Sequence, residues 1–414
     1  MRTISRRSLV AAIAAAVAVG LAACGSEPEK KKEPAAGASK GLAELSAPPA
    51  LPAKPVTLNV IDGGGDLQLS QPAIDELVKR NPKLVSKVTY SKSTGPELAG
   101  KVKAGQDAGK VQYNVVVAGY GEIAAGAQQG LWQKLLPNFE KTLGDVESKY
   151  QEGALKMFRL INGYALTSYY NPNGPLLEYN PGKVSAPPKT PDQLLAWAKA
   201  NPKKFTYARP ANSGPGRTFL MGLPYILGDS NPRDPDKGWD KTWAFLKELD
   251  EYVDHYPAAT GVTMDELTSG AVDMIASTTG WDVNPRALGV VPKDFKIQPF
   301  NGFHFVADAH YMAIPRGVPP GEQAVILKLM SFMLTPRAQA YAYDKGYFYP
   351  GPAVKNVPLS LAPPASQKVV KEYRRPEYDK LFATVPVETQ LDVNDIVFMF
   401  DRWDREVGGS KVKE

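Results

Sequence analysis

Residues 56–65 read VTLNVIDGGG, an apolar and β-branched run that breaks at an acid followed by three glycines. The alternation of apolar and polar side chains predicts a strand over 56–61, and the glycines predict a turn directly after it. The pattern continues with a helix over 71–79, a strand over 85–91, a helix over 96–104 and a strand over 113–118. Strands that alternate with helices are typical of parallel pairing in an open α/β sheet.

Ligands of open α/β sheets bind outside the carboxyl ends of the strands. In this first unit those ends lie at residues 62–68, 91–94 and 119–122. Their polar side chains are therefore candidates for binding a ligand, and they are Asp62, Asp66, Ser93, Tyr120 and Glu122.

A second unit repeats the order of strand, loop and helix over residues 164–300. Its expected elements are a helix that begins at a capping box on Thr190, a strand at 205–208, a long amphipathic helix at 239–256, a helix that begins at a capping box on Thr263, and a strand at 272–276.

The strand at 205–208 leads into a loop, residues 209–217, with the sequence RPANSGPGR before an apolar helical stretch. Backbone N–H groups at a helix start, the Ser213 hydroxyl and a bidentate Arg217 could together hold an anion, with Asn212 beside them. The alternative is a tight turn with an exposed arginine.

Residues 303–314 predict a strand with one apolar face and one face that carries His304, Asp308 and His310. These three side chains could also contribute to a metal site, since imidazole and carboxylate suit transition metals. Residues of the cleft or hinge with satisfied hydrogen bonds are the alternative, and we expect no metal and no cofactor. Helices over 321–334, 337–345 and 394–407 follow.

The N-terminus has the features of an export signal over residues 1–23: three arginines, an apolar run from 9 to 21, and small residues before Cys24. The run is too short to span a bilayer comfortably. LAAC at 21–24 resembles a lipobox, which predicts lipidation of Cys24, and SRRSL at 5–9 resembles a twin-arginine signal. Residues 24–55 are rich in Pro, Ala, Glu and Lys, and they predict a disordered tether.

The 414-residue chain carries a formal charge of +6 and one cysteine, which excludes an internal disulfide. The signal holds three arginines and no acids, so the mature chain carries +3, and residues 56–414 carry +2. A globular part this close to neutral gives no electrostatic reason to expect nucleic acid binding. The sequence also lacks the G-x-S-x-G, H-E-x-x-H and P-loop motifs of common enzymes.

Five segments together resemble those of one family. They are VQYNVVVA (111–118) with GLW (130–132), YALTSYYN (164–171), and YMAIPRG (311–317) with MLTPRAQA (333–340). Their order and spacing, over about residues 56–407 and behind a lipoprotein signal, resemble the extracellular solute-binding proteins of bacterial ABC importers. That group includes maltose-, iron-, thiamine- and polyamine-binding members.

The resemblance implies an α/β, two-lobed fold of the type II periplasmic-binding-protein kind. Each lobe would be an open, mostly parallel sheet flanked by helices, and crossing strands would join the lobes. Lobe one would comprise residues 56–163 and 301–350, and lobe two 164–300 and 351–414. The expected protein is an exported monomer that is lipid-anchored at the outer face of the cytoplasmic membrane or in the periplasm. Its expected partners are a small-molecule solute, ABC permease and ATPase subunits, and the membrane through Cys24.

The same resemblance suggests further ligand-binding residues. Trp281 and Asp282 are similar to the Gly-Trp-acid segment of polyamine-binding members, where carboxylates and aromatic faces hold ammonium groups; the alternative is a tryptophan that covers the edge of the core. Polyamine binders place an aspartate where this chain has His310, although Asp308 lies on the same face. Tyr169 belongs to the expected crossing strand, and with Tyr170 it is only superficially similar to the tyrosine pair of iron binders.

The expected function is therefore capture of a small polar solute, with polyamines as the leading class. A surface lipoprotein that keeps the fold for adhesion or scaffolding is the alternative from another class. An exported hydrolase is a third possibility, to which the absence of catalytic motifs gives little support.

Overall fold

The computed structural model describes residues 42–413, all within one compact unit, residues 36–414. Cys24, the expected signal and residues 24–41 of the expected tether lie outside the described residues. In the described part, no helix is long and apolar enough to cross a membrane.

The stretch that begins at Val56 forms strand β1, which ends at Asp62. It lies inside a seven-stranded sheet in the order β11-β4-β10-β3-β1-β2, with β12 paired to β10. The strands are β2 (Val85–Lys92), β3 (Val115–Gly119), β4 (Leu166–Gly174), β10 (Phe305–Ala313), β11 (Gly351–Pro352) and β12 (Val387–Glu388). We call this first sheet and its helices the first lobe.

Helices follow the parallel strands of the first lobe, as the sequence predicts. The β1 strand pairs in parallel with both β2 and β3, and each of the three leads directly into a helix. The helices of this lobe are α1 (Leu67–Arg80), α2 (Gly95–Asp107), α3 (Tyr120–Gln128), α4 (Glu140–Leu143), α5 (Glu152–Leu160), α11 (Pro320–Met333) and α12 (Pro336–Gln339).

A four-stranded sheet in the order β6-β8-β5-β9 forms the second lobe. Its strands are β5 (Leu176–Tyr179), β6 (Phe205–Thr206), β8 (Met274–Ser277) and β9 (Lys296–Gln298). The helices packed around it are α6 (Pro191–Ala200), α7 (Gly214–Leu227), α8 (Asp240–Asp250), α9 (Thr260–Ser269) and α10 (Thr279–Leu288). A short parallel pair, β7 (Tyr256–Pro257) with β13 (Val412–Lys413), lies beside them.

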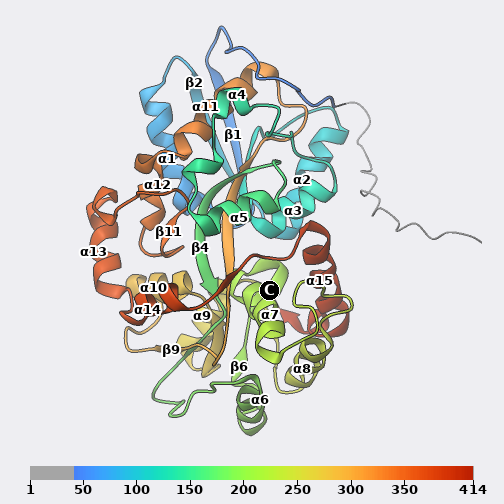
Figure 1. Ribbon diagram of the computed structural model, residues 1–414, viewed down its shortest axis with the longest axis vertical. Coiled ribbons are helices and arrows are strands. Elements are labelled where there is room, and N and C mark those ends of the chain that lie inside the picture. The colour runs from blue at the N-terminus through green and yellow to red at the C-terminus, as the bar shows by residue number, and fades with distance from the viewer. Residues whose placement is uncertain (1–41, 414) are drawn as a thin grey trace, which may run out of the picture. The chain divides into compact units, whose positions relative to one another are not determined.

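Two long strands join the lobes. The β4 strand leads into β5 of the second sheet across one residue, and β10 returns to the first sheet from β9. Both run lengthwise through the molecule in Figure 1, and they pair with each other in antiparallel fashion. The expected parallel pairing thus holds for β1 to β3 and for β6 with β8, whereas the crossing strands are antiparallel to each other. The expectation of a mostly parallel sheet fails for the second lobe, because β5 is antiparallel to both β8 and β9.

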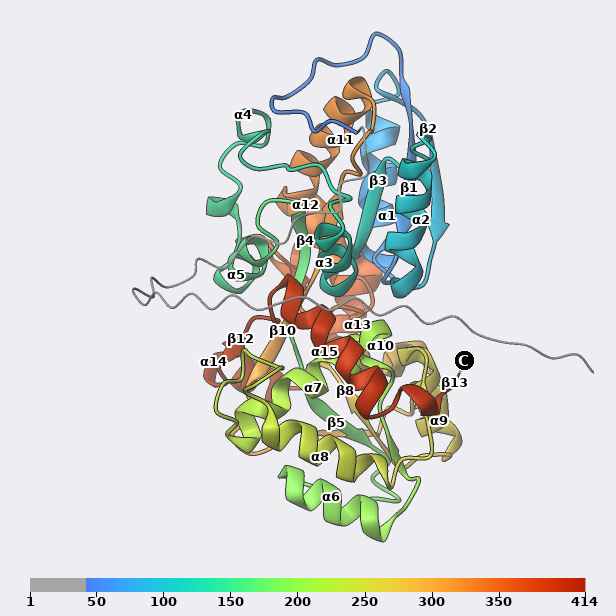
Figure 2. The same cartoon turned by 90° about the vertical axis from the view of Figure 1, so that its right-hand side faces the viewer.

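The C-terminal segment comprises α13 (Pro364–Tyr373), α14 (Glu377–Thr384) and α15 (Val393–Glu406). The sequence assigns it to the second lobe, and Trp403 of α15 does pack there, against Tyr207 and Tyr256. The α15 helix also contacts α3 of the first lobe, and Figure 2 shows it running from the level of α3 down beside α8.

Residues 42–55 differ from the expected free tether. The amide of Leu45 donates to Gln133 Oε1 at 2.8 Å, and Gln133 Nε2 returns a hydrogen bond to the Leu45 carbonyl. Glu44 pairs with Arg316. These partners lie far along the chain, so the low hydrophobicity of the segment does not reveal them.

Three other expectations need correction. Helix α8 ends at Asp250, because the chain turns there towards β7. Helix α9 begins at Thr260, so Thr263 lies inside its first turn and donates its hydroxyl to the Thr260 carbonyl. All nine residues of β10 are buried, because neighbouring strands flank it and helices α3, α5 and α7 pack on it. Its polar side chains therefore lie in the interior.

Candidate functional site

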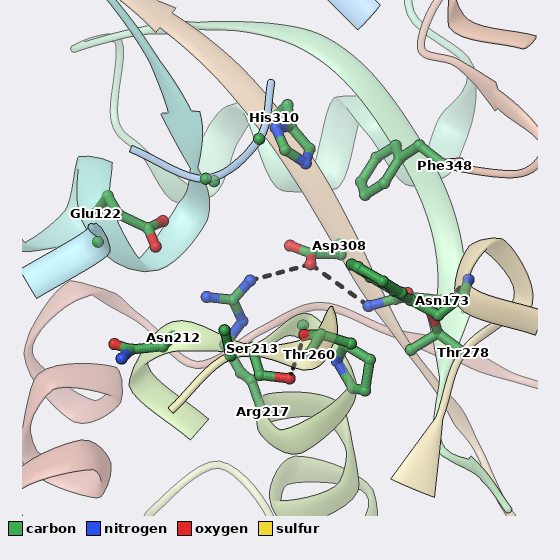
Figure 3. A pocket seen from close by; sticks show the side chains of 18 of the residues that line it. Glu122, Asn173, Asn212, Ser213, Arg217, Thr260, Thr278, Asp308, His310 and Phe348 are labelled. Carbon is green, nitrogen blue, oxygen red and sulfur yellow. Dashed lines mark hydrogen bonds and ion pairs between the residues drawn. The ribbon is translucent and has the colours of Figure 1, made fainter. Parts of the chain in front are cut away.

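A cavity of about 290 Å³ opens where the loops of the two sheets face each other. Residues from the ends of β1 and β3 line one side, and residues at the starts of α7, α9 and α10 line the other. The crossing strands supply Asn171, Asn173, Asp308 and His310 between them. Figure 3 shows Asn173, Asp308 and His310 converging on one space.

The three-glycine turn after β1 forms part of the first-lobe wall. Asp62 organises this turn, since its carboxylate accepts hydrogen bonds from the amides of Gly64 (2.9 Å), Asp66 (3.0 Å) and Leu67 (3.2 Å). A Cβ on Gly64 would lie 3.1 Å from the Gly119 amide nitrogen, so a side chain there would press β3. Asp62 therefore shapes the wall without lining the cavity.

Asp66 lies behind the cavity and pairs with His310, whose Nδ1 is 3.1 Å from Asp66 Oδ2. Burial raises the pKa of Asp66, although the His310 contact opposes the shift. Burial lowers the pKa of His310, but its contact with Asp66 and the nearby carboxylates of Asp308 and Asp62 outweigh burial and leave it raised. The imidazole ring lines the cavity while Asp66 fixes its orientation.

The loop after β6 forms the second-lobe wall, as its sequence predicts. Ser213 caps α7, because its hydroxyl oxygen accepts a hydrogen bond from the Gly216 amide at 3.1 Å. The Thr260 hydroxyl at the start of α9 donates to Ser213 Oγ at 2.8 Å. Two helix N-termini are thereby held side by side at the cavity (Figure 3).

Arg217 in the first turns of α7 forms a buried ion pair with Asp308, at 3.0 Å from Nη2 to Oδ2. The carboxylate of Asp308 also accepts hydrogen bonds from Asn173 (3.4 Å), Gln390 (2.6 Å) and the Ala309 amide (2.9 Å). Each oxygen thus has two donors. Asp308 lines the cavity, but its acceptor capacity is used by the protein itself.

Several buried polar atoms around the cavity have no protein partner. Among the described residues, neither amide atom of Asn171, which is 1% exposed, makes a hydrogen bond, and neither does Arg217 Nε, which is 4% exposed. Glu122 Oε2 is also unpaired. Burial raises the pKa of Glu122 despite the neighbouring Arg217. Buried polar groups without a partner are costly, so their presence on a cavity wall indicates a place where a ligand or water supplies the partner.

Aromatic rings complete the cavity. Trp281 in the first turn of α10 is half-buried and meets Tyr347 edge-on, with ring centroids 5.7 Å apart. Phe348 stands edge-on to His310 at 4.5 Å. These rings offer apolar contact to the part of a ligand that carries no charge.

The structure gathers seven of the sequence-predicted site residues at the cavity. They are Glu122, Asn212, Ser213, Arg217, Trp281, Asp308 and His310. The predictions that the structure places elsewhere are Asp62, Asp66, Ser93, Tyr120, Tyr169 and Asp282. Cys24, the predicted lipidation site, lies outside the described residues.

Asp282 is the most informative of the displaced residues. It is fully buried on the side of α10 away from the cavity, where it binds Arg286 (2.9 Å), Arg375 (2.6 Å) and the Tyr378 hydroxyl (2.6 Å). Its carboxylate thus holds the C-terminal segment to the second lobe. Adjacent residues on a helix point about 100° apart, and here Trp281 lines the cavity whereas Asp282 contacts the C-terminal segment.

Three further predicted residues make contacts within the protein and do not line the cavity. The Ser93 hydroxyl donates to the Thr94 carbonyl, and its amide donates to that of Asp62. Tyr120 is buried against Tyr311 at 6.0 Å between ring centroids. Tyr169 donates its hydroxyl to the Leu69 carbonyl at 3.2 Å.

The proposed metal ligands are not brought together. His304 Nδ1 lies 2.9 Å from Glu388 Oε1, and its ring stacks on Tyr225, whereas His310 pairs with Asp66. Among residues 42–413, no group of three or more histidine, cysteine or acidic side chains could hold a metal ion.

Sequence reasoning missed Asn171, Asn173, Thr260 and the 347–348 aromatic pair. Asn171 and Asn173 lie near the end of β4, one of the two crossing strands. A strand end is a position where ligand-binding residues are expected, so the sequence does indicate them. The sequence does not reveal Thr260, because its pattern predicts that the helix begins at Thr263, whereas α9 begins three residues earlier. The aromatic pair comes from a loop whose position depends on tertiary packing.

The model of the family described as bacterial extracellular solute-binding protein matches residues 73–372. The chain belongs to this family. A search of curated protein sequences found no match. Membership of an extracellular family implies that this solute-binding protein is exported.

Solved structures of other proteins share this fold at low sequence identity. An ABC transporter structure from Clostridium perfringens has a TM-score of 0.60 at 13% identity, with 85% of this chain and 100% of that chain covered. The spermidine/putrescine substrate-binding protein PotD from Streptococcus pneumoniae has a TM-score of 0.54 at 16% identity (84% and 99%). AfuA from Actinobacillus pleuropneumoniae, with fructose-6-phosphate bound, has a TM-score of 0.59 at 13% identity (85% and 98%).

These likenesses confirm the type II periplasmic-binding-protein fold that the sequence predicts for this solute-binding protein. The family and its structural neighbours are binding proteins of ABC transport systems. What a neighbour binds does not carry over at such identities, so the solute has to be argued from the cavity itself.

Proposed function

We propose that this protein captures a small polar solute in the cavity between its lobes and delivers it to the permease of an ABC importer. The observation that carries the proposal is the set of buried, unpaired polar groups on the cavity wall, Asn171 and Arg217 Nε. A scaffold or adhesion protein would gain nothing from leaving these groups without partners, because each one costs stability.

Closure of the lobes is the proposed mechanism. Gly64 and Glu122 contribute to the cavity from the first lobe, and Ser213 and Trp281 contribute from the second. A solute that contacts both walls favours the closed form, because it shifts the equilibrium only through contacts that are better in that form. The permease would then receive the closed, loaded protein, and no covalent step is involved.

Polyamines are one solute class within this proposal, and PotD is named as a binder of spermidine and putrescine. That class needs carboxylates with free acceptor capacity at the cavity. Glu122 is such a group, because it lines the cavity and its Oε2 is unpaired. In contrast, Asp282 lies outside the cavity and Asp308 has two donors on each oxygen. The support for polyamines is therefore weaker than the sequence alone suggests.

Thermal unfolding against a panel of polyamines, amino acids, sugars, carboxylates and phosphate esters tests solute capture. A solute at about 100 times its Kd stabilises the folded chain by about 2.7 kcal/mol, which is a clear rise in Tm. If no compound of any charge class raises the Tm, the alternative of a non-transport surface lipoprotein gains support.

The variant Asn171→Leu makes the panel specific to this cavity. Leucine has a similar volume and removes both unpaired amide atoms, so the ligand-free variant should be as stable as the wild type or more stable. The rise in Tm with the solute should shrink. An unchanged rise would place the solute elsewhere on the molecule.

Membrane attachment at Cys24 and a monomeric state are further parts of the proposal. Radiolabelled palmitate should enter the wild-type protein in cells and not the Cys24→Ser variant, which should be released from the membrane fraction. Sedimentation of the purified protein with and without solute tests the monomeric state.

A further inference from the structure

The N-termini of five helices of nine residues or more meet at the cavity. Each contributes a cap or first-turn residue to the wall: Thr94 for α2, Gly119 for α3, Ser213 for α7, Thr260 for α9 and Thr278 for α10. The first N–H groups of a helix have no partner within it, and each N-terminus carries about half a positive elementary charge.

Side-chain caps satisfy only a small part of these groups. Ser213 accepts one amide of α7 and Thr278 accepts one of α10 at 3.5 Å, whereas α2, α3 and α9 have no side-chain cap. The nearby α1 helix is different, because the Asp62 carboxylate already accepts the Asp66 and Leu67 amides at its start. The chain thus supplies an acid for the N-terminus of α1, and Glu97 and Glu122 lie in the first turns of α2 and α3. The N-termini of α7 and α9 carry no acidic side chain in their first turns.

The ionisable side chains do not cancel this positive field. Arg217 and Asp308 neutralise each other as a pair. Glu122 is the remaining acid that lines the cavity, and its burial raises its pKa, which favours the neutral form that can donate a hydrogen bond. His310 forms a second ion pair, with Asp66.

Unpaired side-chain groups provide a second and independent observation. Arg217 Nε is a donor that is buried without a partner in the described part of the chain, and Asn171 offers a further donor on the cavity wall. Both side chains are more than nine-tenths buried. A cationic ligand could not use the Arg217 donor, whereas an oxyanion could accept from it.

We propose that the solute is an organic anion whose phosphate or carboxylate group is held by these helix N-termini, by Arg217 Nε and by Asn171. The uncharged part of the solute would pack against Trp281 and Phe348. This inference rests on the proposed function and narrows it to one charge class, which differs from the polyamine class that the sequence favours.

Matched pairs of small molecules separate charge from shape. Isothermal titration of the purified protein at low ionic strength would compare succinate with putrescine, which has the same four-carbon length and the opposite charge. Glucose 6-phosphate would be compared with glucose, and inorganic phosphate would show whether the anion alone is sufficient. Binding of succinate distinguishes a carboxylate site, and binding of a phosphate ester distinguishes a phosphate site.

A charge variant at Thr94 tests the same inference within the protein. Thr94 is the exposed N-cap of α2 and makes no capping hydrogen bond, so Asp or Asn there should favour the helix. Thr94→Asp adds a negative charge at the cavity and Thr94→Asn matches its shape without the charge. An anion should bind Thr94→Asp about tenfold or more weakly than Thr94→Asn.

The possible outcomes test solute capture and the binding of an anion separately. Binding of an anionic probe, with the loss in Thr94→Asp relative to Thr94→Asn, supports the inference. Binding of putrescine or glucose but of no anion overturns the inference and leaves solute capture standing. Equal anion affinity in the two Thr94 variants places the anion away from this wall and also overturns it. Failure of every probe of every charge counts against both solute capture and the inference.

Discussion

Arg217 of α7 and Asp308 of β10 form an ion pair in which each residue is 4% exposed, and the pair ties a second-lobe helix to a strand that crosses between the lobes. The pair does two things at once. It neutralises the only acid on the crossing strands that lines the cavity, and it positions the guanidinium so that Nε faces no protein acceptor.

The variant Asp308→Asn should destabilise the protein by about 3–5 kcal/mol, because it leaves the Arg217 charge buried without its counter-ion. Urea unfolding checks this. Glu147→Gln is the control, since Glu147 pairs with Arg159 at an exposed site and should change the free energy of unfolding by less than about 1 kcal/mol. If the two substitutions changed the free energy of unfolding equally, Arg217 and Asp308 would not form a buried ion pair.

A second prediction concerns Glu178 of β5, whose carboxyl group is fully buried near Asp282. Burial, together with the charge of Asp282, raises the pKa of Glu178 to about 8. In the unfolded chain Glu178 loses its proton near the ordinary pKa of glutamate, whereas in the folded chain it keeps the proton up to a pH of about 8. Between those two values the unfolded state binds fewer protons, so stability falls as pH rises, by at most about 1.4 kcal/mol per pH unit.

The Glu178→Gln variant isolates this contribution, because glutamine keeps the shape and cannot titrate. Urea midpoints from pH 5 to pH 8 should decline more steeply for the wild type than for Glu178→Gln. Parallel profiles would mean that Glu178 is already ionised in the folded protein at pH 5.

The sequence predicts most of the strands and helices that position the cavity, because the 56–65 pattern and the loop at 209–217 carry their information locally. Alternating strands identify a sheet, and the ends of the strands identify its ligand edge. For this reason Ser213 and Arg217 were found from the sequence and do line the cavity.

Residues whose surroundings depend on distant parts of the chain could not be placed in this way. Asp282 faces Arg375 and Tyr378, which follow it by more than 90 positions. Asp62 is engaged by the turn that follows it, so the position of a carboxylate at a strand end does not tell whether it faces the ligand or caps the next helix. The convergence of five helix N-termini is likewise a property of the fold.

The neighbours Trp281 and Asp282 give the last prediction, because the structure assigns them different tasks. Trp281→Ala removes an aromatic wall of the cavity, so the affinity for a confirmed solute should fall by about tenfold, a loss of about 1.4 kcal/mol, while Trp281→Phe should retain part of it. Asp282→Asn weakens a buried charge cluster with Arg286 and Arg375 and should lower the free energy of unfolding by about 3–5 kcal/mol. Because the Asp282 carboxylate does not reach the cavity, the folded fraction of that variant should bind the solute with wild-type Kd. Titration calorimetry and urea unfolding of the same preparations distinguish these effects. If Asp282→Asn lost as much affinity as Trp281→Ala, Asp282 would have to be part of the binding site.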